Sequence, residues 1–152
     1  MESTLNDILS RRSIKKYKST PVPQELTDKI INAGLYAPSG MGAQSPIIIQ
    51  VTNKEMRNKL AKMNADIMGA DTDPFYGAPC VLIVLANKNC RTAIYDGSLV
   101  MENLMLAAHA LGLGSCWIHR AKEEFESEEG KEILKSLGIE GEYIGIGHCI
   151  IG

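Results

Sequence analysis

The chain has 152 residues, of which 45% are hydrophobic and 22% are charged, and its formal net charge at pH 7 is −2. This length and composition predict one globular domain over residues 1–152 that buries a core without disulfides, and they are not those of a disordered chain. Because the net charge is slightly negative and the sequence shows neither a secretory leader nor an apolar run of membrane-spanning length, we expect a cytoplasmic protein with no nucleic-acid or membrane partner.

The first predicted helix and the segment after it combine an apolar stripe with a run of positive charge. A short amphipathic helix is predicted over residues 3–11, and residues 11–18 contain five cations in eight positions. Arginine can grip a phosphate with two donors, so cations beside the Ser13 hydroxyl suit an anion. A solvated basic face is the alternative interpretation. A second helix is predicted from about residue 24 to residue 36.

Residues 37–46, with the sequence Ala-Pro-Ser-Gly-Met-Gly-Ala-Gln-Ser-Pro, form a loop that lets another molecule approach its backbone. Two prolines stiffen its ends, and Gly40 and Gly42 remove side chains that would block close contact. Small polar groups on such a loop suit a flat cofactor that needs one face covered, whereas an ordinary helix-to-strand turn is the alternative. The apolar, β-branched run over residues 47–51 predicts a buried strand.

The middle of the chain predicts two helices on either side of a buried strand. The first helix runs from about residue 54 to residue 68 with Asn53 as its N-cap, a turn-rich connector covers residues 69–77, and residues 80–86 form a continuous apolar strand. The next helix, from about residue 91 to residue 111, is apolar around nearly its whole circumference. Such a helix needs cover on nearly all sides, which one small domain does not offer, so we expect a second subunit against it.

The last third of the chain predicts a strand over residues 114–119, a charged helix from about residue 124 to residue 137, and a final strand over residues 143–151. The cysteines at positions 80, 90, 116 and 149 form no Cys-x-x-Cys motif, and we expect them to be reduced. Cys116 and His119, and likewise His148 and Cys149, would point to opposite faces of their strands, so we expect no metal site.

Four motifs occur in the same order as in a known family. They are Arg11-Arg12-Ser13-x-Lys15-x-Tyr17, Ala37-Pro38-Ser39-Gly40-x-x-x-Gln44, Leu111-Gly112-Leu113-Gly114-x-Cys116-Trp117-Ile118 and Ile144-Gly145-Ile146-Gly147. Together they resemble the FMN-dependent nitroreductase family over essentially the whole chain, whereas no P-loop or Rossmann fingerprint is present. The resemblance implies an α+β fold with a mainly antiparallel central sheet flanked by helices, and a homodimer with two FMN sites at the subunit interface.

The resemblance also implies which residues bind the cofactor. Arg11, Arg12 and Ser13 match the positions that hold the phosphate and ribityl end, and Lys15 matches the basic residue near flavin N1 and O2. Residues 38–44 match the loop that the other subunit lays against the isoalloxazine, and residues 118–120 match a strand end whose backbone N–H faces flavin N5. Asn64 is a further candidate, for the pyrimidine edge. In chain order, the implied residues are Arg11, Arg12, Ser13, Lys15, Pro38, Ser39, Gly40, Gln44, Asn64, Ile118, His119 and Arg120.

Three differences from the family pattern bear on this site. Gly42 and Ser45-Pro46 stand where many members have Asn and Gln-Pro-Trp, so we expect different contacts on the substrate side. The connector over residues 64–77 is short for a lid that covers substrate. The chain ends at Gly152, just after the last predicted strand, where longer members continue with a segment that embraces the partner and adds basic residues to the phosphate.

The expected function is that of an FMN-dependent oxidoreductase. NAD(P)H and a small acceptor, such as a nitroaromatic or a quinone, would occupy one site in turn, with ping-pong hydride transfer through flavin N5. Flavin supplies this chemistry, so no catalytic side chain is needed, and Lys15 is expected to stabilise the anionic reduced flavin. The alternatives are a non-catalytic flavin-binding protein, such as a sensor, and an interaction protein that kept the fold and lost FMN.

Overall fold

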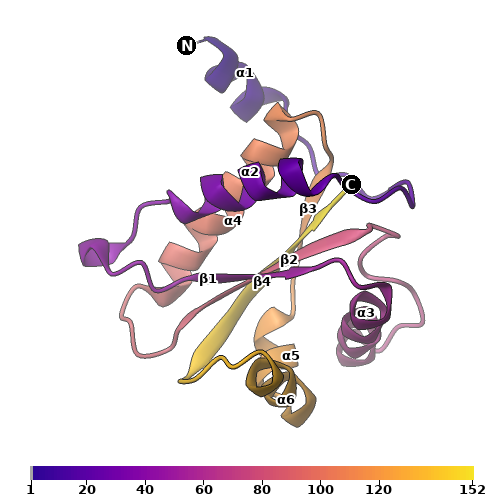
Figure 1. Ribbon diagram of the computed structural model, residues 1–152, viewed down its shortest axis with the longest axis vertical. Helices are drawn as coiled ribbons and strands as arrows, with labels where there is room; N and C mark the ends of the chain where they lie inside the picture. The colour runs from indigo at the N-terminus through magenta and orange to yellow at the C-terminus, as the bar shows by residue number, and fades with distance from the viewer. Residues whose placement is uncertain (1) are drawn as a thin grey trace.

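The computed structural model describes residues 2–152, which form four strands, six α-helices and one 3₁₀ turn (Figure 1). The predicted order of helices and strands is confirmed except that the last predicted helix is divided in two, and the first strand and third helix have the predicted bounds. In chain order, the elements are α1 (Glu2–Ser10), α2 (Gln24–Leu35), the 3₁₀ turn η1 (Gly40–Gly42), β1 (Ile47–Val51), α3 (Lys54–Met68), β2 (Cys80–Asn87), α4 (Ala93–Ala110), β3 (Ser115–Ile118), α5 (Ala121–Glu126), α6 (Glu128–Ser136) and β4 (Tyr143–Ile151).

The strands form one antiparallel sheet in the order β1-β2-β4-β3, which confirms the predicted α+β fold. Helices α2 and α4 lie on one face of the sheet, and α3, α5 and α6 lie on the other (Figure 1). Side chains of a strand alternate between its faces, so Leu82 and Val84 enter the core under α4, whereas Val81 and Ile83 enter the core beside α3. β2 is a continuous apolar run because both of its faces are buried.

β1 differs from the prediction, because it is an edge strand rather than a buried one. It pairs with β2 on one side, and Val51 is its one residue in the fully buried core, while the other four are half-buried. The β-branched run predicts a strand correctly, but it contains no information on the strand's neighbours. The position of a strand in a sheet is decided by long-range pairing.

The predicted charged helix over about 124–137 is instead two helices, α5 and α6, which meet at Ser127. The Ser127 Oγ accepts a hydrogen bond from the Gly130 N–H at 3.1 Å and so begins α6 as its N-cap. The two helices approach closely, since a Cβ on Gly130 would lie 2.0 Å from the Glu124 carbonyl oxygen. The charged composition of this segment predicts helix throughout, and the serine cap divides it.

α4 is strongly apolar, and one chain leaves part of it uncovered. It buries Met101 and Leu104 in the core between the sheet and α2. Ile94, Tyr95 and Leu99 of the same helix remain exposed. Within residues 2–152, no helix, α4 included, is long and apolar enough to cross a membrane.

The middle of β4 combines a bulge with a close approach to α5. Val84 pairs with Gly147 and Leu85 pairs with Gly145, so Ile146 is the extra residue of the bulge. A Cβ on Gly145 would lie 2.2 Å from the carbonyl oxygen of Ala121, so a glycine is needed for the start of α5 to rest on the strand. This contact places α5 directly after the end of β3.

Gly145→Ala is therefore expected to lower the free energy of unfolding by roughly 3 kcal/mol, at the upper end of the usual cost of overpacking, because its neighbours are backbone atoms that cannot rotate away. Gly112→Ala is the matched control, since Gly112 has a φ of +80° and open space where a Cβ would be. It should lose only about 1 kcal/mol, from the left-handed backbone. Chemical denaturation measures both losses, and equal values would contradict the close approach.

Candidate functional site

The basic segment over residues 11–18 begins along the outer edge of β3. Ser13 forms a parallel bridge with Ser115, and the Ile14 N–H donates to the Ser115 carbonyl oxygen at 2.9 Å. Among residues 2–152, no other backbone pairs with this edge of the sheet. The basic segment therefore covers only the beginning of the edge.

The ladder between β3 and β4 decides which backbone groups face the open edge. Gly114 and Gly152 exchange two hydrogen bonds of 2.7 and 3.2 Å. Bonded pairs alternate in an antiparallel ladder, so Cys116 and Ile118 also direct their N–H and C=O groups toward β4. The N–H of His119 therefore points away from β4 and is a donor at an open sheet edge.

This open edge forms one wall of a cavity of about 580 Å³, a volume typical of ligand pockets, which span roughly 300–1,000 Å³. The opposite wall comes from the end of α3 and from the connector between α3 and β2. Five of the implied cofactor-binding residues line the cavity together, although they come from segments far apart in the sequence. They are Ser13, Lys15, Ile118, His119 and Arg120.

The cavity wall contains more positive than negative charge. Lys15 is exposed, with its ammonium 5.9 Å from the centroid of the Tyr76 ring, and Arg120 is half-buried. Within the described part of the chain, neither cation lies within ion-pair distance of a carboxylate. The acidic side chain of the wall, Asp73, is paired with Arg57 at 2.6 Å. The cavity therefore suits an anionic group.

Asp73 organises the connector that forms the opposite wall. Its oxygens accept hydrogen bonds from Arg57 at 2.6 Å and from the N–H groups of Phe75 and Gly77 at 3.0 and 2.8 Å. Burial raises the pKa of Asp73, but these hydrogen bonds outweigh burial and hold the pKa below its usual value. Sequence reasoning missed this role, although an Asp followed by Pro in a turn-rich connector was a signal for it.

Arg11 and Arg12, implied at the phosphate, do not line the cavity in one chain. Arg12 donates to the Leu9 carbonyl oxygen at 3.0 Å, at the C-terminal end of α1, where a cation is favourable. The Arg11 Nε lies 3.9 Å from a carboxylate oxygen of Glu102 on α4. The Nη1 of Arg11 is buried and has no hydrogen-bond acceptor among the described residues.

The loop over residues 38–44 is separate from the cavity within one chain. Its η1 turn lies at the outer end of the molecule, away from β3 (Figure 1). The Gly40 N–H donates to Asp96 Oδ1 at 2.9 Å, and the Gln44 N–H donates to Ser39 Oγ at 2.9 Å. These bonds give the loop a defined shape. Its four implied cofactor-binding residues form a second surface, made of Pro38, Ser39, Gly40 and Gln44.

Asn64 lies behind the cavity wall and does not line it. Its side chain is fully buried, its Nδ2 donates to the His119 carbonyl oxygen at 2.8 Å, and its Oδ1 accepts from Arg120 Nε at 2.9 Å. The amide is thus engaged by the protein and holds the strand end from the inside. A polar position in a polar helix gives no sequence signal of such burial.

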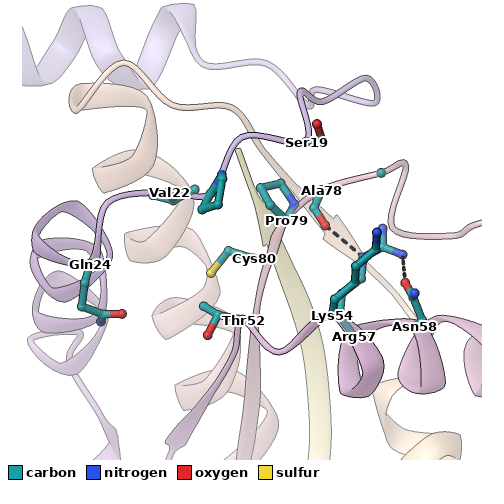
Figure 2. Close-up of a pocket in the computed structure, with 12 residues that line it drawn as sticks. Ser19, Val22, Gln24, Thr52, Lys54, Arg57, Asn58, Ala78, Pro79 and Cys80 are labelled. Carbon is teal, nitrogen blue, oxygen red and sulfur yellow. Dashed lines mark hydrogen bonds between the residues drawn. The ribbon is translucent and has the colours of Figure 1, made fainter.

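A second cavity, of about 490 Å³, lies between the chain before α2 and the start of α3 (Figure 2). Arg57 lines it, and each guanidinium nitrogen already donates to protein, including Ala78 O at 2.9 Å and Asn58 Oδ1 at 3.2 Å. Burial raises the pKa of the Cys80 thiol to about 11, so the thiol is protonated at neutral pH. The guanidinium nitrogens of Arg57 therefore all have protein partners. None of the cofactor-binding residues that the resemblance implies lines this cavity, whereas five of them line the cavity at the edge of β3.

The fold, with its antiparallel sheet and its cavity at an edge strand, has a close structural counterpart. A nitroreductase from Bacteroides fragilis with bound FMN superposes with a TM-score of 0.89 and 28% sequence identity, covering 98% of this chain and 87% of that chain. The structure thus defines a protein of the nitroreductase fold.

The comparison of sequences gives the same assignment. The model of the nitroreductase family matches residues 8–152, and the chain belongs to this family. A relative from Methanothermobacter thermautotrophicus is 36% identical over 117 residues, and the NADPH-flavin oxidoreductase of Vibrio harveyi is 31% identical over 129 residues. These matches cover 74% and 78% of this chain, and they span 59% and 54% of the two relatives.

Asp73→Asn is expected to destabilise the protein at neutral pH, because it leaves Arg57 without its carboxylate. Hydrogen bonds to charged groups contribute about 1.5–3 kcal/mol, and partial exposure of Asp73 lowers the expected loss to about 1–2 kcal/mol. Since the pKa of Asp73 is depressed, its contribution is present above the unfolded pKa near ~4 and is lost as the pH falls below that value.

Urea denaturation should therefore separate wild type from Asp73→Asn at neutral pH and bring the two together in acid. Asp71→Asn is the matched control, because Asp71 is exposed in the same connector, and its effect should stay below about 0.5 kcal/mol. A difference between wild type and Asp73→Asn that does not shrink in acid would contradict the role of the carboxylate.

Proposed function

We propose that this protein is an FMN-dependent oxidoreductase that uses NAD(P)H to reduce a small acceptor, such as a quinone or a nitroaromatic. The observation that carries the proposal is the cavity at the open edge of β3, where Ser13, Lys15 and residues 118–120 meet. Two comparisons support it, since the Bacteroides fragilis structure contains FMN and the Vibrio harveyi relative is named an NADPH-flavin oxidoreductase.

The residues of the cavity fit FMN. A phosphate needs hydroxyl and cationic donors. Ser13 lines the cavity, and residues 11–18 place five cations next to it in the sequence. A flat ring with polar edges needs donors beside it, which the His119 N–H at the open strand edge offers. Asp73 does not oppose the phosphate, because Arg57 neutralises it.

The residues that line the cavity would each have a distinct role. Bound FMN would supply two-electron transfer, and the protein would position and tune it. Ser13 would donate to the phosphate end, and the His119 N–H would orient the ring against the strand end. Lys15 would stabilise the negative charge that reduction places on the ring, a preorganised electrostatic effect. NAD(P)H and the acceptor would use the same open face in turn.

We infer further that the protein is a homodimer in which the loop over residues 38–44 completes the cavity of the other subunit. The loop has a fixed shape and an exposed tip at Met41, but it lies apart from the cavity of its own chain. α1 has no buried residue, and α4 exposes Ile94, Tyr95 and Leu99. An interface of this kind resembles a divided core and would bury more than about 2,000 Å².

We also propose a cytoplasmic location, because all four cysteines lie in the described part of the chain and are free. A flavin-binding protein without turnover is the second candidate. It is supported by the same cavity, and slow reoxidation of the reduced flavin by every acceptor tried would favour it.

The purified protein is expected to bind one FMN per chain, to release FMN rather than FAD on denaturation, and to oxidise NADH or NADPH in the presence of a quinone or a nitroaromatic. Initial rates at several fixed acceptor levels should give parallel double-reciprocal lines, because both substrates use one face in turn. Intersecting lines would contradict the shared face, and a protein that takes up no FMN would overturn the proposed function.

Lys15→Met refines this experiment, with Lys16→Met as its control. Loss of a preorganised donor costs roughly 2.7–4 kcal/mol in well-studied enzymes and less at an exposed position, so Lys15→Met should lower the midpoint potential of the bound flavin. Its FMN affinity should change little, since the phosphate contacts remain. Lys16 is exposed and does not line the cavity, so Lys16→Met should keep the wild-type potential.

Leu99→Glu is expected to convert the dimer to a monomer, because it places a charge on the exposed apolar face of α4. Leu137→Glu is the matched control, since Leu137 follows α6 on the other face of the sheet and is 54% exposed, against 44% for Leu99. Light scattering at micromolar concentration measures the mass, and FMN should be lost together with the dimer. A monomer that keeps FMN on dilution would contradict the shared site.

A further inference from the structure

A buried polar network lies directly behind the strand end that forms the cavity wall. Glu124 on α5 and His148 on β4 are fully buried, with Glu124 Oε2 and His148 Nε2 2.6 Å apart. Asn64 on α3 joins this pair by donating through Nδ2 to Glu124 Oε2 at 3.2 Å. Burying polar groups is costly, and Glu124 Oε1 and His148 Nε2 have no hydrogen-bond partner of good geometry among the described residues, so the contacts through Glu124 Oε2 and Asn64 hold this network together.

Asn64 has one possible orientation in this network. The His119 carbonyl oxygen can only accept, so the atom of Asn64 that faces it is the NH₂ group. The Arg120 guanidinium can only donate, so the atom that faces it is the amide oxygen. Reversing the amide would break both bonds, and this fixes the side chain between α5 and the end of β3.

The network contacts two successive peptide groups, the first of which is already directed by the pairing of β3 with β4. The Ile118 carbonyl oxygen lies 3.2 Å from His148 Nδ1, and the His119 carbonyl oxygen accepts from Asn64. In a trans peptide, an N–H points opposite to the carbonyl of the preceding residue. The N–H groups of His119 and Arg120 therefore point away from the buried side chains, on the side where the strand end lines the cavity.

Arg120 needs this support, because its backbone has a φ of +75°. A residue with a Cβ persists in the left-handed region only when its surroundings hold it there. The bond of 2.9 Å from Arg120 Nε to Asn64 Oδ1 supplies that hold, and α5 begins at the next residue.

We propose that Asn64, Glu124 and His148 are positioning residues of the cavity, which fix the two peptide groups whose N–H donors face the ligand. That the ligand is FMN rests on the proposed function, whereas the fixed peptide geometry does not. Asn64 is central, because its contacts join the carboxylate of α5 to the strand end and to Arg120.

Glu124 has a specific requirement that a glutamine does not meet. Its Oε2 faces Asn64 Nδ2 and His148 Nε2 at once. An amide nitrogen at that place would face the Asn64 amide nitrogen, donor against donor. An amide oxygen there would remove the negative charge beside His148. Glu124→Gln therefore either sets two donors face to face, or keeps both contacts but loses the charge and buries an NH₂ group where Oε1 has no partner among the described residues. The shape of the side chain is nearly preserved in both orientations.

The experiment compares Asn64→Leu and Glu124→Gln with Leu60→Ala. Leu60 is fully buried on α3, one turn before Asn64, so Leu60→Ala removes core packing and leaves the network intact. Fluorescence titration gives the FMN Kd, and calorimetry gives the Tm. We expect the Kd to rise by about tenfold or more in the two network variants, the loss that one charge-assisted bond produces. Leu60→Ala should keep the wild-type Kd even where its Tm falls as far.

NMR of the protein without FMN provides the second readout. The one-bond Cα–Hα coupling of Arg120 distinguishes positive from negative φ, and it should change in Asn64→Leu and Glu124→Gln but not in Leu60→Ala. An unchanged Kd or an unchanged coupling in both network variants would overturn the proposal, as would an equal loss of affinity in Leu60→Ala. If the wild type takes up no FMN, the proposed function fails and the coupling alone decides the positioning role. If Asn64→Leu does not fold, Glu124→Gln decides both readouts.

Discussion

The pairing of β3 with β4 is the constraint on which the site depends. β3 has only four residues and lies at the edge of the sheet, so every second residue bonds to β4 and the others face outward. The basic segment covers the first outward position at Ser115, and the cavity opens at the later ones. Open edges invite pairing with other chains, and charged side chains oppose it. Lys15 and Arg120 stand beside this edge, so the same charges that discourage strand addition also attract an anion.

The close packing of α5 against β4 extends this constraint. Because Gly145 has no side chain, α5 begins immediately after the strand end and brings Glu124 under it. The chain then has only His119 and Arg120 in which to turn from strand to helix, and Arg120 makes the turn with a positive φ. The end of β3, the turn at Arg120 and the start of α5 are therefore joined to one another through the buried contacts of Asn64, Glu124 and His148.

Local sequence patterns predict the helices and strands well, but they predict poorly which of them lie next to one another in space. The β-branched run predicts β1 and the polar segment after Asn53 predicts α3, both with their correct bounds. Asn53 caps α3 as expected, accepting from the Met56 N–H at 2.9 Å. The same patterns cannot show that β1 lies at an edge or that Asn64 is buried, because both depend on segments distant in sequence. The motif resemblance indicates residues that meet at the cavity, but it cannot show that the loop over residues 38–44 stays apart from them within one chain.

The environment of Cys90 makes the loop over residues 38–44 accessible to spectroscopy. Three of the four cysteines are buried, whereas Cys90 is half-buried. Its Sγ lies 4.0 Å from Asp96 Oδ2, and the other oxygen of that carboxylate accepts from the Gly40 N–H. A thiol-reactive fluorophore should therefore label one position of the native chain, beside the anchor of the loop. Its emission would follow the surroundings of that loop in solution, with no engineered cysteine.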